Sequence, residues 1–285
     1  MDHLTIRVHD LAFTYPGRER PAIKHMTFEV ARGEVFGFLG PSGAGKTTTQ
    51  RVLIGLLEGW TGDVEILGRD RRSWGTALYD RIGVAFELPV GYPRLTARED
   101  LTHFANLHAA ISRDVDELLE SVGLSEVADG PVGSYSKGMR VRLNLARALL
   151  HEPDILFADE PTAGLDPVNT GIVREHILEQ KRQRRTVVVT THDMDTAKAV
   201  CDRVAFIVDG RIVACDSPRA FRLAHARPEL RVEYRTDDGV TSARFPLGQA
   251  PPELVALLSS GRVETVHTSE ATLGEVFAEV TGRRL

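Results

Sequence analysis

The chain has few cysteines, no long apolar run and no excess of basic residues among its 285 residues. Cys201 and Cys215 lie far from any metal-ligand spacing, so we expect two reduced thiols and neither a disulfide nor a zinc site. No apolar stretch approaches the ~18 residues that a membrane-spanning helix requires, and residues 1–5 do not resemble a signal peptide. The 35 basic and 40 acidic residues give a net charge of −5, which provides no general affinity for nucleic acid or anionic lipid. We therefore expect a cytosolic chain with no nucleic-acid partner.

The most informative stretch is the sequence GPSGAGKTT at residues 40–48, which follows an apolar run and opens a helical pattern. A buried strand, a glycine-rich turn and a helix start in this order are what a phosphate-binding loop needs. Glycine lets the backbone curl so that successive N–H groups point at one anion, and the helix N-terminus adds partial positive charge. Lys46 can then reach the β- and γ-phosphates of ATP, and the Thr47 hydroxyl can ligate Mg²⁺. The residues expected to contact nucleotide are Gly40, Pro41, Ser42, Gly43, Ala44, Gly45, Lys46, Thr47 and Thr48.

Two adjacent carboxylates, Asp159 and Glu160, follow a second apolar run at residues 155–158. At the C-terminal edge of a parallel sheet they would lie beside the nucleotide crevice. We expect Asp159 to hold Mg²⁺, directly or through water, and Glu160 to accept a proton from the attacking water. The predicted chemistry is hydrolysis of ATP, with Lys46 and Glu160 as catalytic residues.

Apolar strands and helical patterns alternate along much of the chain, which predicts a largely parallel sheet covered on both faces. The strands expected in this sheet lie at residues 35–39, 82–86, 155–158, 186–190 and 204–208. The helices expected to cover it lie at residues 48–57, 167–182 and 194–200. Residues 4–15 and 23–30 predict a small antiparallel sheet laid over the core.

Two regions depart from this alternation. Residues 88–150 predict an inserted helical subdomain, with helices at residues 97–110 and 115–122. The last part predicts a small α+β appendage, with a hairpin around Asp238-Gly239, helices at residues 252–258 and 272–281, and a strand at residues 263–266. The predicted fold is therefore an α/β P-loop NTPase domain over residues 1–218, with an N-terminal antiparallel β subdomain, followed by an appendage over residues 219–285.

The segment Tyr135-Ser136-Lys137-Gly138-Met139 resembles the signature motif of the ATP-binding subunits of ABC transporters, and the resemblance covers nearly all of residues 1–217. Ser136 and the N–H of Gly138 at a helix start would form a second anion site, although the same residues also predict a plain helix capped by Ser136. This site is not expected to close over its own phosphate loop. The family pairs two subunits head to tail, which implies a second copy or a homologous subunit as a partner.

Three further positions match the family in order. Tyr15 resembles the aromatic residue that stacks on adenine, and its alternative role is packing at a strand end. Asp166 closes a segment that resembles the loop along the dimer seam, and it would also cap a helix starting at Pro167. His192 resembles the switch histidine that contacts the γ-phosphate, which implies a catalytic role.

The chain departs from the family pattern at two places. Glu87 stands where the family usually has a glutamine beside Mg²⁺. A carboxylate can ligate Mg²⁺ through oxygen but cannot donate an N–H group. In the signature, Lys137 and Met139 replace the commoner glycine and glutamine, and Lys137 either adds a cation near the opposing nucleotide or is simply solvated.

Residues 271–283 resemble the last helix of the drug and antibiotic export branch, and they also predict an amphipathic cap helix. In that branch the transmembrane partner is a separate permease, which implies a peripheral position on the cytoplasmic face of the cell membrane. Residues 88–95, with apolar residues flanked by turn formers, are expected either to hold a cytoplasmic helix of the permease or to form a plain connector. The resemblance thus implies an ATP-hydrolysing subunit that powers the export of drugs, antibiotics or other small hydrophobic compounds.

Three rival functions stay open at this point. The same ATPase could drive an importer or a lipid exporter. A soluble ABC ATPase that acts on ribosomes or DNA would carry tandem cassettes or a long coiled-coil insertion, and the sequence has neither. A non-catalytic scaffold would not need Lys46, Asp159 and Glu160 together.

Overall fold

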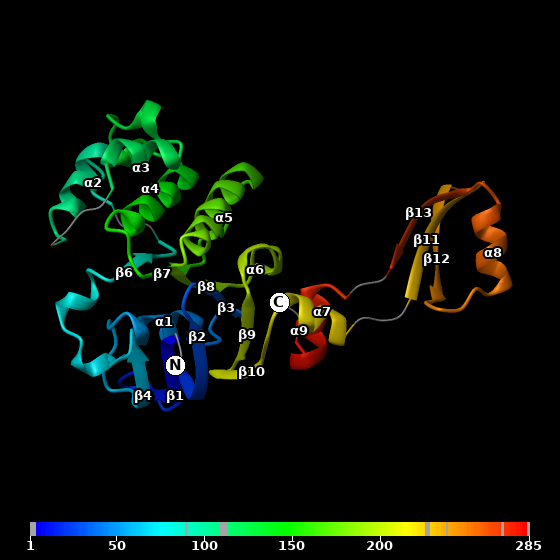
Figure 1. Ribbon diagram of the computed structural model, residues 1–285, viewed down its shortest axis with the longest axis horizontal. Helices are drawn as coiled ribbons and strands as arrows, with labels where there is room; N and C mark the ends of the chain where they lie inside the picture. Colours follow the sequence, from blue (N-terminus) through cyan, green and yellow to red (C-terminus); the bar gives the residue numbers. More distant parts are fainter. Residues whose placement is uncertain are drawn as a thin grey trace. The chain divides into compact units, whose positions relative to one another are not determined.

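The computed structural model describes residues 4–88, 91–108, 113–225, 229–237, 239–268 and 271–283. The chain forms two compact units, one ending at Pro218 and the other spanning residues 219–284 (Figure 1). Parts of three predicted features lie outside the described residues: Pro89 and Val90 in the 88–95 segment, residues 109–110 of a predicted helix, and Asp238 of the predicted hairpin. In the described ranges, no helix is long and apolar enough to cross a membrane.

A six-stranded sheet forms the core of the first unit, in the order β10-β9-β3-β8-β7-β6. Its strands are β3 (Val35–Leu39), β6 (Ile82–Ala85), β7 (Ile155–Asp159), β8 (Thr186–Thr191), β9 (Arg203–Val208) and β10 (Arg211–Asp216). All neighbouring strands run parallel except β9 and β10, and every residue of β3, β7 and β8 is buried. These strands are rich in β-branched and aromatic residues, which suit a sheet covered on both faces. The predicted α/β core is confirmed, and β10 is an additional edge strand that was not predicted.

A second, antiparallel sheet packs beside this core in the order β2-β1-β4-β5. Its strands are β1 (Leu4–Phe13), β2 (Ile23–Ala31), β4 (Thr61–Ile66) and β5 (Arg69–Asp70). Phe28 of β2 packs against Phe36 and Phe38 of β3, with ring centroids 5.8 and 5.0 Å away. Helix α1 (Lys46–Leu53) belongs to the same apolar cluster, whereas α5 (Pro167–Arg182) and α6 (Met194–Val200) lie on the other side of the parallel sheet (Figure 1).

Helix α1 begins and ends earlier than the helix predicted at residues 48–57. Beyond its end, Gly55 has a φ of 82°, in the left-handed region. The Arg71 guanidinium lies so close to Gly55 that an added Cβ would be 1.2 Å from Arg71 Nη2. Arg71 Nε also donates to the carbonyl oxygen of Leu53 at 2.9 Å. An arginine from a later segment therefore supplies a hydrogen-bond donor to a carbonyl oxygen at the end of this helix. A local sequence pattern does not reveal where the helix ends.

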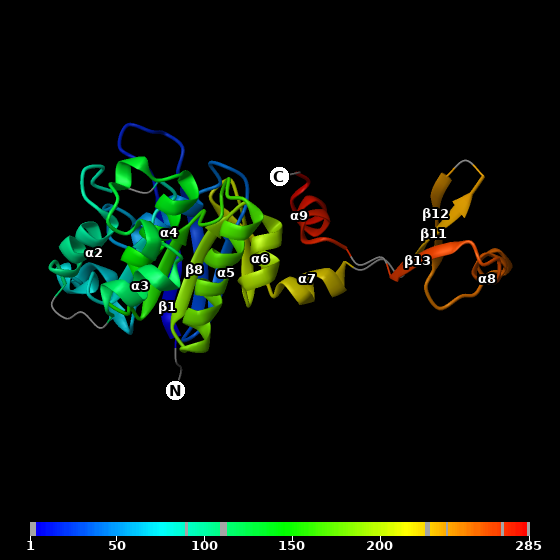
Figure 2. The same ribbon diagram turned by 90° about the horizontal axis from the view of Figure 1, so that it is seen from above.

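The inserted helical lobe contains α2 (Ala97–Ala105), α3 (Val115–Ser121) and α4 (Lys137–Leu149), grouped beside α5 in both views (Figures 1 and 2). Thr96 caps α2 in a reciprocal capping box with Glu99. Inside the lobe, Arg147 Nη2 lies 2.7 Å from Asp100 Oδ2. The remaining short helices of this unit are the 3₁₀ turns η1 (Arg71–Ser73), η2 (Thr76–Leu78), η3 (Ser125–Val127) and η4 (Val132–Ser134). The predicted helical insertion is confirmed.

The second unit contains a three-stranded sheet, in the order β12-β11-β13. Its elements are α7 (Pro218–Ala224), β11 (Glu229–Thr236), β12 (Gly239–Pro246), α8 (Pro252–Ser259), β13 (Val263–Thr268) and α9 (Leu273–Thr281). The pairing of Thr236 with Gly239 closes the predicted hairpin. Helix α9 buries Leu273, Val276 and Phe277, as expected for an amphipathic cap helix.

Candidate functional site

The glycine-rich loop between β3 and α1 is held so tightly that side chains are excluded at two of its positions. A Cβ on Gly40 would lie 2.2 Å from the carbonyl oxygen of Ile207, and one on Gly45 would lie 2.7 Å from that of Ala22. Gly45 also has a φ of 110°. It is the N-cap of α1 and contributes no side-chain hydrogen bond to that helix end. The loop therefore brings bare backbone and a helix N-terminus together, which is the requirement for binding phosphate.

Lys46, the first residue of α1, is buried within this loop. Its Nζ donates to the carbonyl oxygens of Gly40 at 2.6 Å and Pro41 at 3.2 Å. The same ammonium lies 3.4 Å from Glu160 Oε1. The phosphate loop and the second predicted carboxylate are thus in direct contact.

Asp159, the last residue of β7, is buried beside the first turn of α1. Its Oδ1 accepts a hydrogen bond from Thr47 Oγ1 at 3.0 Å. The hydroxyl of Thr190, opposite it on β8, donates to the same oxygen. A hydroxyl and a carboxylate oxygen, both hard oxygen ligands, therefore lie together at the C-terminal edge of the sheet.

Glu160 follows β7 with a φ of 46°, a left-handed conformation that is uncommon for a residue with a Cβ. Its backbone N–H donates to the carbonyl oxygen of Thr190 at 2.8 Å. Its Oε2 lies 3.2 Å from Thr191 Oγ1 and 2.9 Å from His192 Nδ1. The left-handed backbone directs the carboxylate toward both β8 and Lys46, and such local strain often marks a functional position.

Tyr15 lies at the edge of this group. Its hydroxyl and Thr48 Oγ1 are 3.2 Å apart, and its ring meets Phe13 edge-on with centroids 4.9 Å apart. The remaining loop residues differ in exposure: Ser42 and Gly43 are exposed, and Ala44 is buried. The structure thus brings Tyr15, Lys46, Thr47, Thr48 and the three residues Asp159, Glu160 and His192 to one edge of the sheet.

The signature residues lie in a separate group where α4 meets α5. Ser136 caps α4 by accepting the N–H of Met139 at 3.2 Å. A Cβ on Gly138 would come within 2.9 Å of the Asn169 side chain. Asp166 caps α5 by accepting the N–H groups of Val168 and Asn169 at 3.0 Å, and the hydrogen bonds from Asn169 lower the pKa of this carboxyl.

No hydrogen bond or ion pair joins the signature group to Lys46 or to Glu160 within the described parts of the chain.

Glu87 is also apart from the other predicted ligands. It is exposed just beyond β6, which runs parallel to β7 with Ala85 opposite Ala158. Among the described residues it makes no hydrogen bond or ion pair.

Sequence reasoning missed Thr190 and Thr191 as functional residues and treated them as the end of a strand. A signal was available, because two consecutive hydroxyl residues end a strand that is expected to neighbour the carboxylate strand. Asn169 was also missed. Its contact with Gly138 depends on the packing of α4 against α5 and leaves no local sequence signal.

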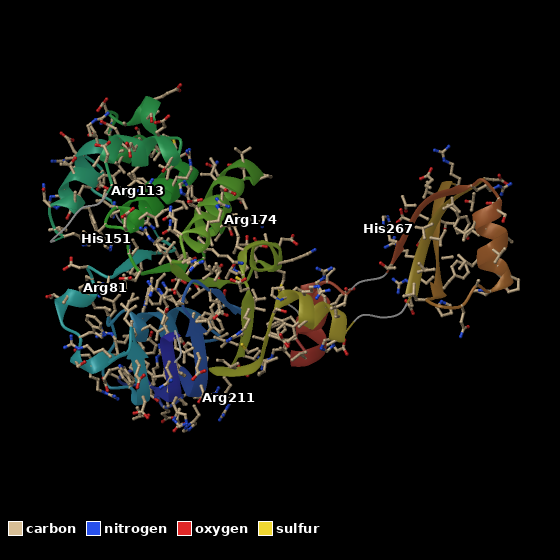
Figure 3. The ribbon with its side chains drawn as sticks, in the orientation of Figure 1. Arg81, Arg113, His151, Arg174, Arg211 and His267 are labelled. Carbon is tan, nitrogen blue, oxygen red and sulfur yellow. The ribbon has the colours of Figure 1, made fainter. Side chains whose placement is uncertain are left out.

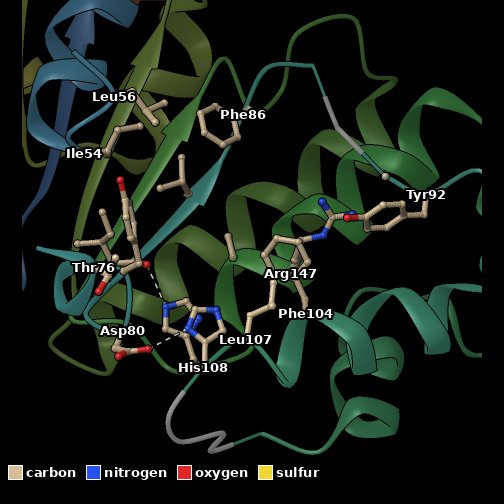
Figure 4. Close-up of a pocket in the computed structure, with 16 residues that line it drawn as sticks. Ile54, Leu56, Thr76, Asp80, Phe86, Tyr92, Phe104, Leu107, His108 and Arg147 are labelled. Carbon is tan, nitrogen blue, oxygen red and sulfur yellow. Dashed lines mark hydrogen bonds and ion pairs between the residues drawn. The ribbon is translucent and has the colours of Figure 1, made fainter. Parts of the chain in front are cut away.

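A groove of about 830 Å³ opens between the core and the helical lobe (Figure 4). Its lining is mainly apolar and includes Leu56, Phe86, Tyr92, Phe104 and Leu107. Tyr92 is 53% exposed, and the neighbouring Leu88 is 78% exposed. Exposed apolar side chains concentrated in this way are typical of interaction surfaces.

Two stacked histidines line the groove and join the lobe to the core. The rings of His108 and His151 are 3.9 Å apart, and His108 Nδ1 lies 3.3 Å from Asp80 Oδ1. His151 Nε2 lies 2.9 Å from the carbonyl oxygen of Ile82, and burial lowers the pKa of His151. Figure 3 shows His151 and Arg81 where the helical lobe meets the core sheet.

Comparison with known proteins gives a consistent result. Residues 23–163 match the family model described as ABC transporter. The chain is 50% identical over 283 residues to a fluoroquinolones export ATP-binding protein of Mycobacterium tuberculosis, covering 98% of this chain and 94% of that protein. It is 37% identical over 210 residues to the bacitracin transport ATP-binding protein of Bacillus licheniformis, covering 73% and 68% of the two chains.

Solved structures show the same architecture. A dimeric ATP-binding cassette in a post-hydrolysis state with ADP and Pi superposes with a TM-score of 0.68 at 25% identity, covering 74% of this chain and 98% of that one. The cbiO1 protein of Clostridium perfringens, part of the ABC transporter complex cbiONQ, gives a TM-score of 0.69 at 26% identity, with coverage of 79% of this chain and 92% of that one.

Proposed function

Since the chain belongs to the ABC transporter family, we propose that it is the ATP-hydrolysing subunit of an exporter of drugs, antibiotics or other small hydrophobic compounds. The resemblance of the chain to the drug-export branch is confirmed by its 50% identity to a fluoroquinolones export ATP-binding protein. The observation that carries the proposal is the contact of Lys46 with Glu160, which supports a role for this carboxylate beside the phosphate loop as the base. Residues 1–218 would form the ATPase domain, and residues 219–285 an appendage to it.

The residues at the sheet edge fit a magnesium ion. Thr47 Oγ1 and Asp159 Oδ1, 3.0 Å apart, supply hard oxygen ligands. In the described ranges, no group of three or more His, Cys, Asp or Glu residues could hold a metal by itself. This fits Mg²⁺, which usually binds through one or two protein ligands together with substrate phosphates and water. Thr47 and Asp159 would hold the ion, which would supply positive charge to offset the negative charge that develops on the phosphates.

The protein groups each have a place in hydrolysis. Glu160 would accept a proton from the attacking water as the water oxygen bonds to the γ-phosphorus and the bond from that phosphorus to ADP breaks. The Lys46 ammonium would stabilise negative charge on the phosphates. His192 Nδ1 lies 2.9 Å from Glu160 Oε2, so this side chain would link the base to the γ-phosphate. Tyr15 would stack on adenine, because its ring stands at the edge of the loop.

A second copy, or a homologous subunit, would complete the nucleotide site. Ser136, Gly138 and Asp166 form a group apart from the chain's own phosphate loop, so they would face the nucleotide of a partner across the dimer seam. A C2 dimer arranged head to tail would then place two ATP molecules between one phosphate loop and the other signature. ATP binding would close the dimer, and hydrolysis would open it.

The groove between the core and the lobe would hold a cytoplasmic helix of a separate permease. Its apolar lining and the exposed Tyr92 support this role, which would place the subunit on the cytoplasmic face of the cell membrane. Glu87 lies at the same junction and would ligate Mg²⁺ through a carboxylate oxygen when the site closes.

The proposal is tested by measuring phosphate release from ATP by the purified chain, with Mg²⁺ and with excess EDTA. We expect turnover that depends on Mg²⁺ and that falls by roughly 10²-fold or more in Asp159→Asn, since one carboxylate oxygen becomes an amide. Exposed Asp195, in the first turn of α6, provides the control Asp195→Asn. ATP turnover that persists in EDTA would contradict the proposal.

A further inference from the structure

Strand β8 ends in two threonines, each facing one of the two carboxylates at the end of β7. Thr190 and Thr191 are 0% and 1% exposed. Thr190 lies opposite Asp159 in the parallel pairing of β8 with β7. The pairing ends there, and Glu160, which follows β7 with its left-handed backbone, lies beside the next threonine. Thr190 therefore contacts Asp159, and Thr191 contacts Glu160.

The Thr191 hydroxyl has two partners, and their chemistry sets the direction of each hydrogen bond. Thr191 Oγ1 accepts the backbone N–H of Asp193 at 2.9 Å and lies 3.2 Å from Glu160 Oε2. The backbone N–H can only donate and a carboxylate can only accept, so the single hydroxyl hydrogen goes to Glu160. The carboxylate thus sets the hydroxyl as the donor, and the Asp193 N–H at the turn into α6 holds the hydroxyl oxygen in place.

The two oxygens of Glu160 have different surroundings as a result. Oε2 is close to Thr191 Oγ1, to the His192 backbone N–H at 3.3 Å and to His192 Nδ1 at 2.9 Å. Oε1 lies 3.4 Å from Lys46 Nζ, inside the phosphate loop. The His192 side chain is 55% exposed, whereas Thr191 is buried. Thr191 is therefore the more rigid of the two side chains that hold Oε2.

We propose that Thr191 is a positioning residue, which anchors Oε2 of Glu160 so that Oε1 faces the phosphate loop and acts on the attacking water. The inference rests on the proposed role of Glu160 as the base. Thr191 itself would not touch the substrate. Loss of its hydroxyl would free the carboxylate to rotate, and catalysis depends steeply on the position of such a group.

The test compares Thr191→Val, which keeps the shape and removes the donor, with Thr191→Ser, which keeps the donor. We expect kcat for ATP hydrolysis to fall roughly 10-fold in Thr191→Val with KM unchanged, because nucleotide binding does not use this hydroxyl. Thr191→Ser should restore kcat to within about twofold of the wild type. The control is Thr5→Val, because the buried Thr5 hydroxyl lies 3.0 Å from Thr186 Oγ1 at the opposite end of β8.

A double variant shows whether Thr191 acts through Glu160. If it does, Thr191→Val should not lower the residual turnover of Glu160→Gln any further. If Thr191→Val does not fold, the comparison is made between Thr191→Ala and Thr191→Ser. A wild-type kcat in Thr191→Val, equal kcat in the alanine and serine variants, or an additive loss in the double variant would overturn the inference. Wild-type turnover in Glu160→Gln alone would instead contradict the proposed function.

Discussion

Replacing Lys46 with alanine removes the side-chain cation of the phosphate loop. In the structure this ammonium lies 2.6 Å from the carbonyl oxygen of Gly40, 3.2 Å from that of Pro41 and 3.4 Å from Glu160 Oε1, and it is only 6% exposed. In Lys46→Ala a triphosphate would meet backbone dipoles in place of a full positive charge. The lost contact is a buried, charge-assisted one, which is the stronger class of hydrogen bond.

The size of the effect follows from that contact. A hydrogen bond to a charged group is worth about 1.5–3 kcal/mol, so losing one or two of them lowers nucleotide affinity by roughly 10²-fold. Stability should change less, because the substitution removes a desolvated cation and leaves Glu160 with His192 as a neighbour. We therefore expect the melting temperature to shift by no more than about 2–4 °C, which corresponds to a change near 1 kcal/mol for a large domain.

The assay is titration of the purified protein with a fluorescent ATP analogue, followed by measurement of phosphate release. Lys198→Ala is the matched control, because Lys198 is an exposed lysine on α6. We expect Lys198→Ala to bind and hydrolyse ATP as the wild type does. Unchanged affinity and turnover in Lys46→Ala would refute the reasoning, because residues 40–48 would then be a structural turn.

Three further predictions concern Glu87, Tyr92 and the two cysteines. Glu87→Gln should preserve ATP hydrolysis by the isolated subunit because an amide oxygen remains, whereas Glu87→Ala should lower Mg²⁺-dependent turnover. Equal rates in the two variants would contradict Mg²⁺ ligation by this side chain. Tyr92→Ala should leave the ATPase activity of the isolated subunit within about twofold of the wild type and should reduce transport when the permease is present. Loss of ATPase activity in the isolated subunit would instead show that the loop carrying Tyr92 belongs to the active site. Burial raises the pKa of Cys201 to about 12, so this thiol stays protonated and unreactive at pH 8, whereas the exposed Cys215 can be alkylated. Mass spectrometry should find one modified thiol in the native protein and two after denaturation, and two in the native protein would contradict the burial of Cys201.

Much of the fold follows from local sequence patterns. The apolar runs that became β3, β7 and β8 are short and rich in aliphatic, aromatic or β-branched residues, and all of them form the central sheet. The phosphate loop is likewise a local motif, because the strand, glycines and helix start are contiguous in the chain. The end of α1 is different, since it depends on Arg71 from a later segment.

The details of the site depend on contacts between distant segments. The approach of Lys46 to Glu160 requires the left-handed backbone of Glu160, which no residue type near it indicates. The hydroxyl of Thr191 meets the same carboxylate because β8 pairs with β7 in one particular register. The groove also joins side chains from the core and the lobe, such as Leu56 and His151, that are about a hundred residues apart. A single sequence identifies the reacting groups but not the neighbours that orient them.

The most direct test of an ATP-driven subunit is the size of Glu160→Gln on gel filtration with Mg²⁺ and ATP. The substitution keeps the side-chain shape and removes the base, so ATP should still bind while turnover falls by roughly 10²-fold or more. We predict that this variant elutes as a dimer with ATP and as a monomer with ADP, because hydrolysis is the step that opens the dimer. A variant that binds ATP but stays monomeric, or that hydrolyses ATP at the wild-type rate, would contradict the account.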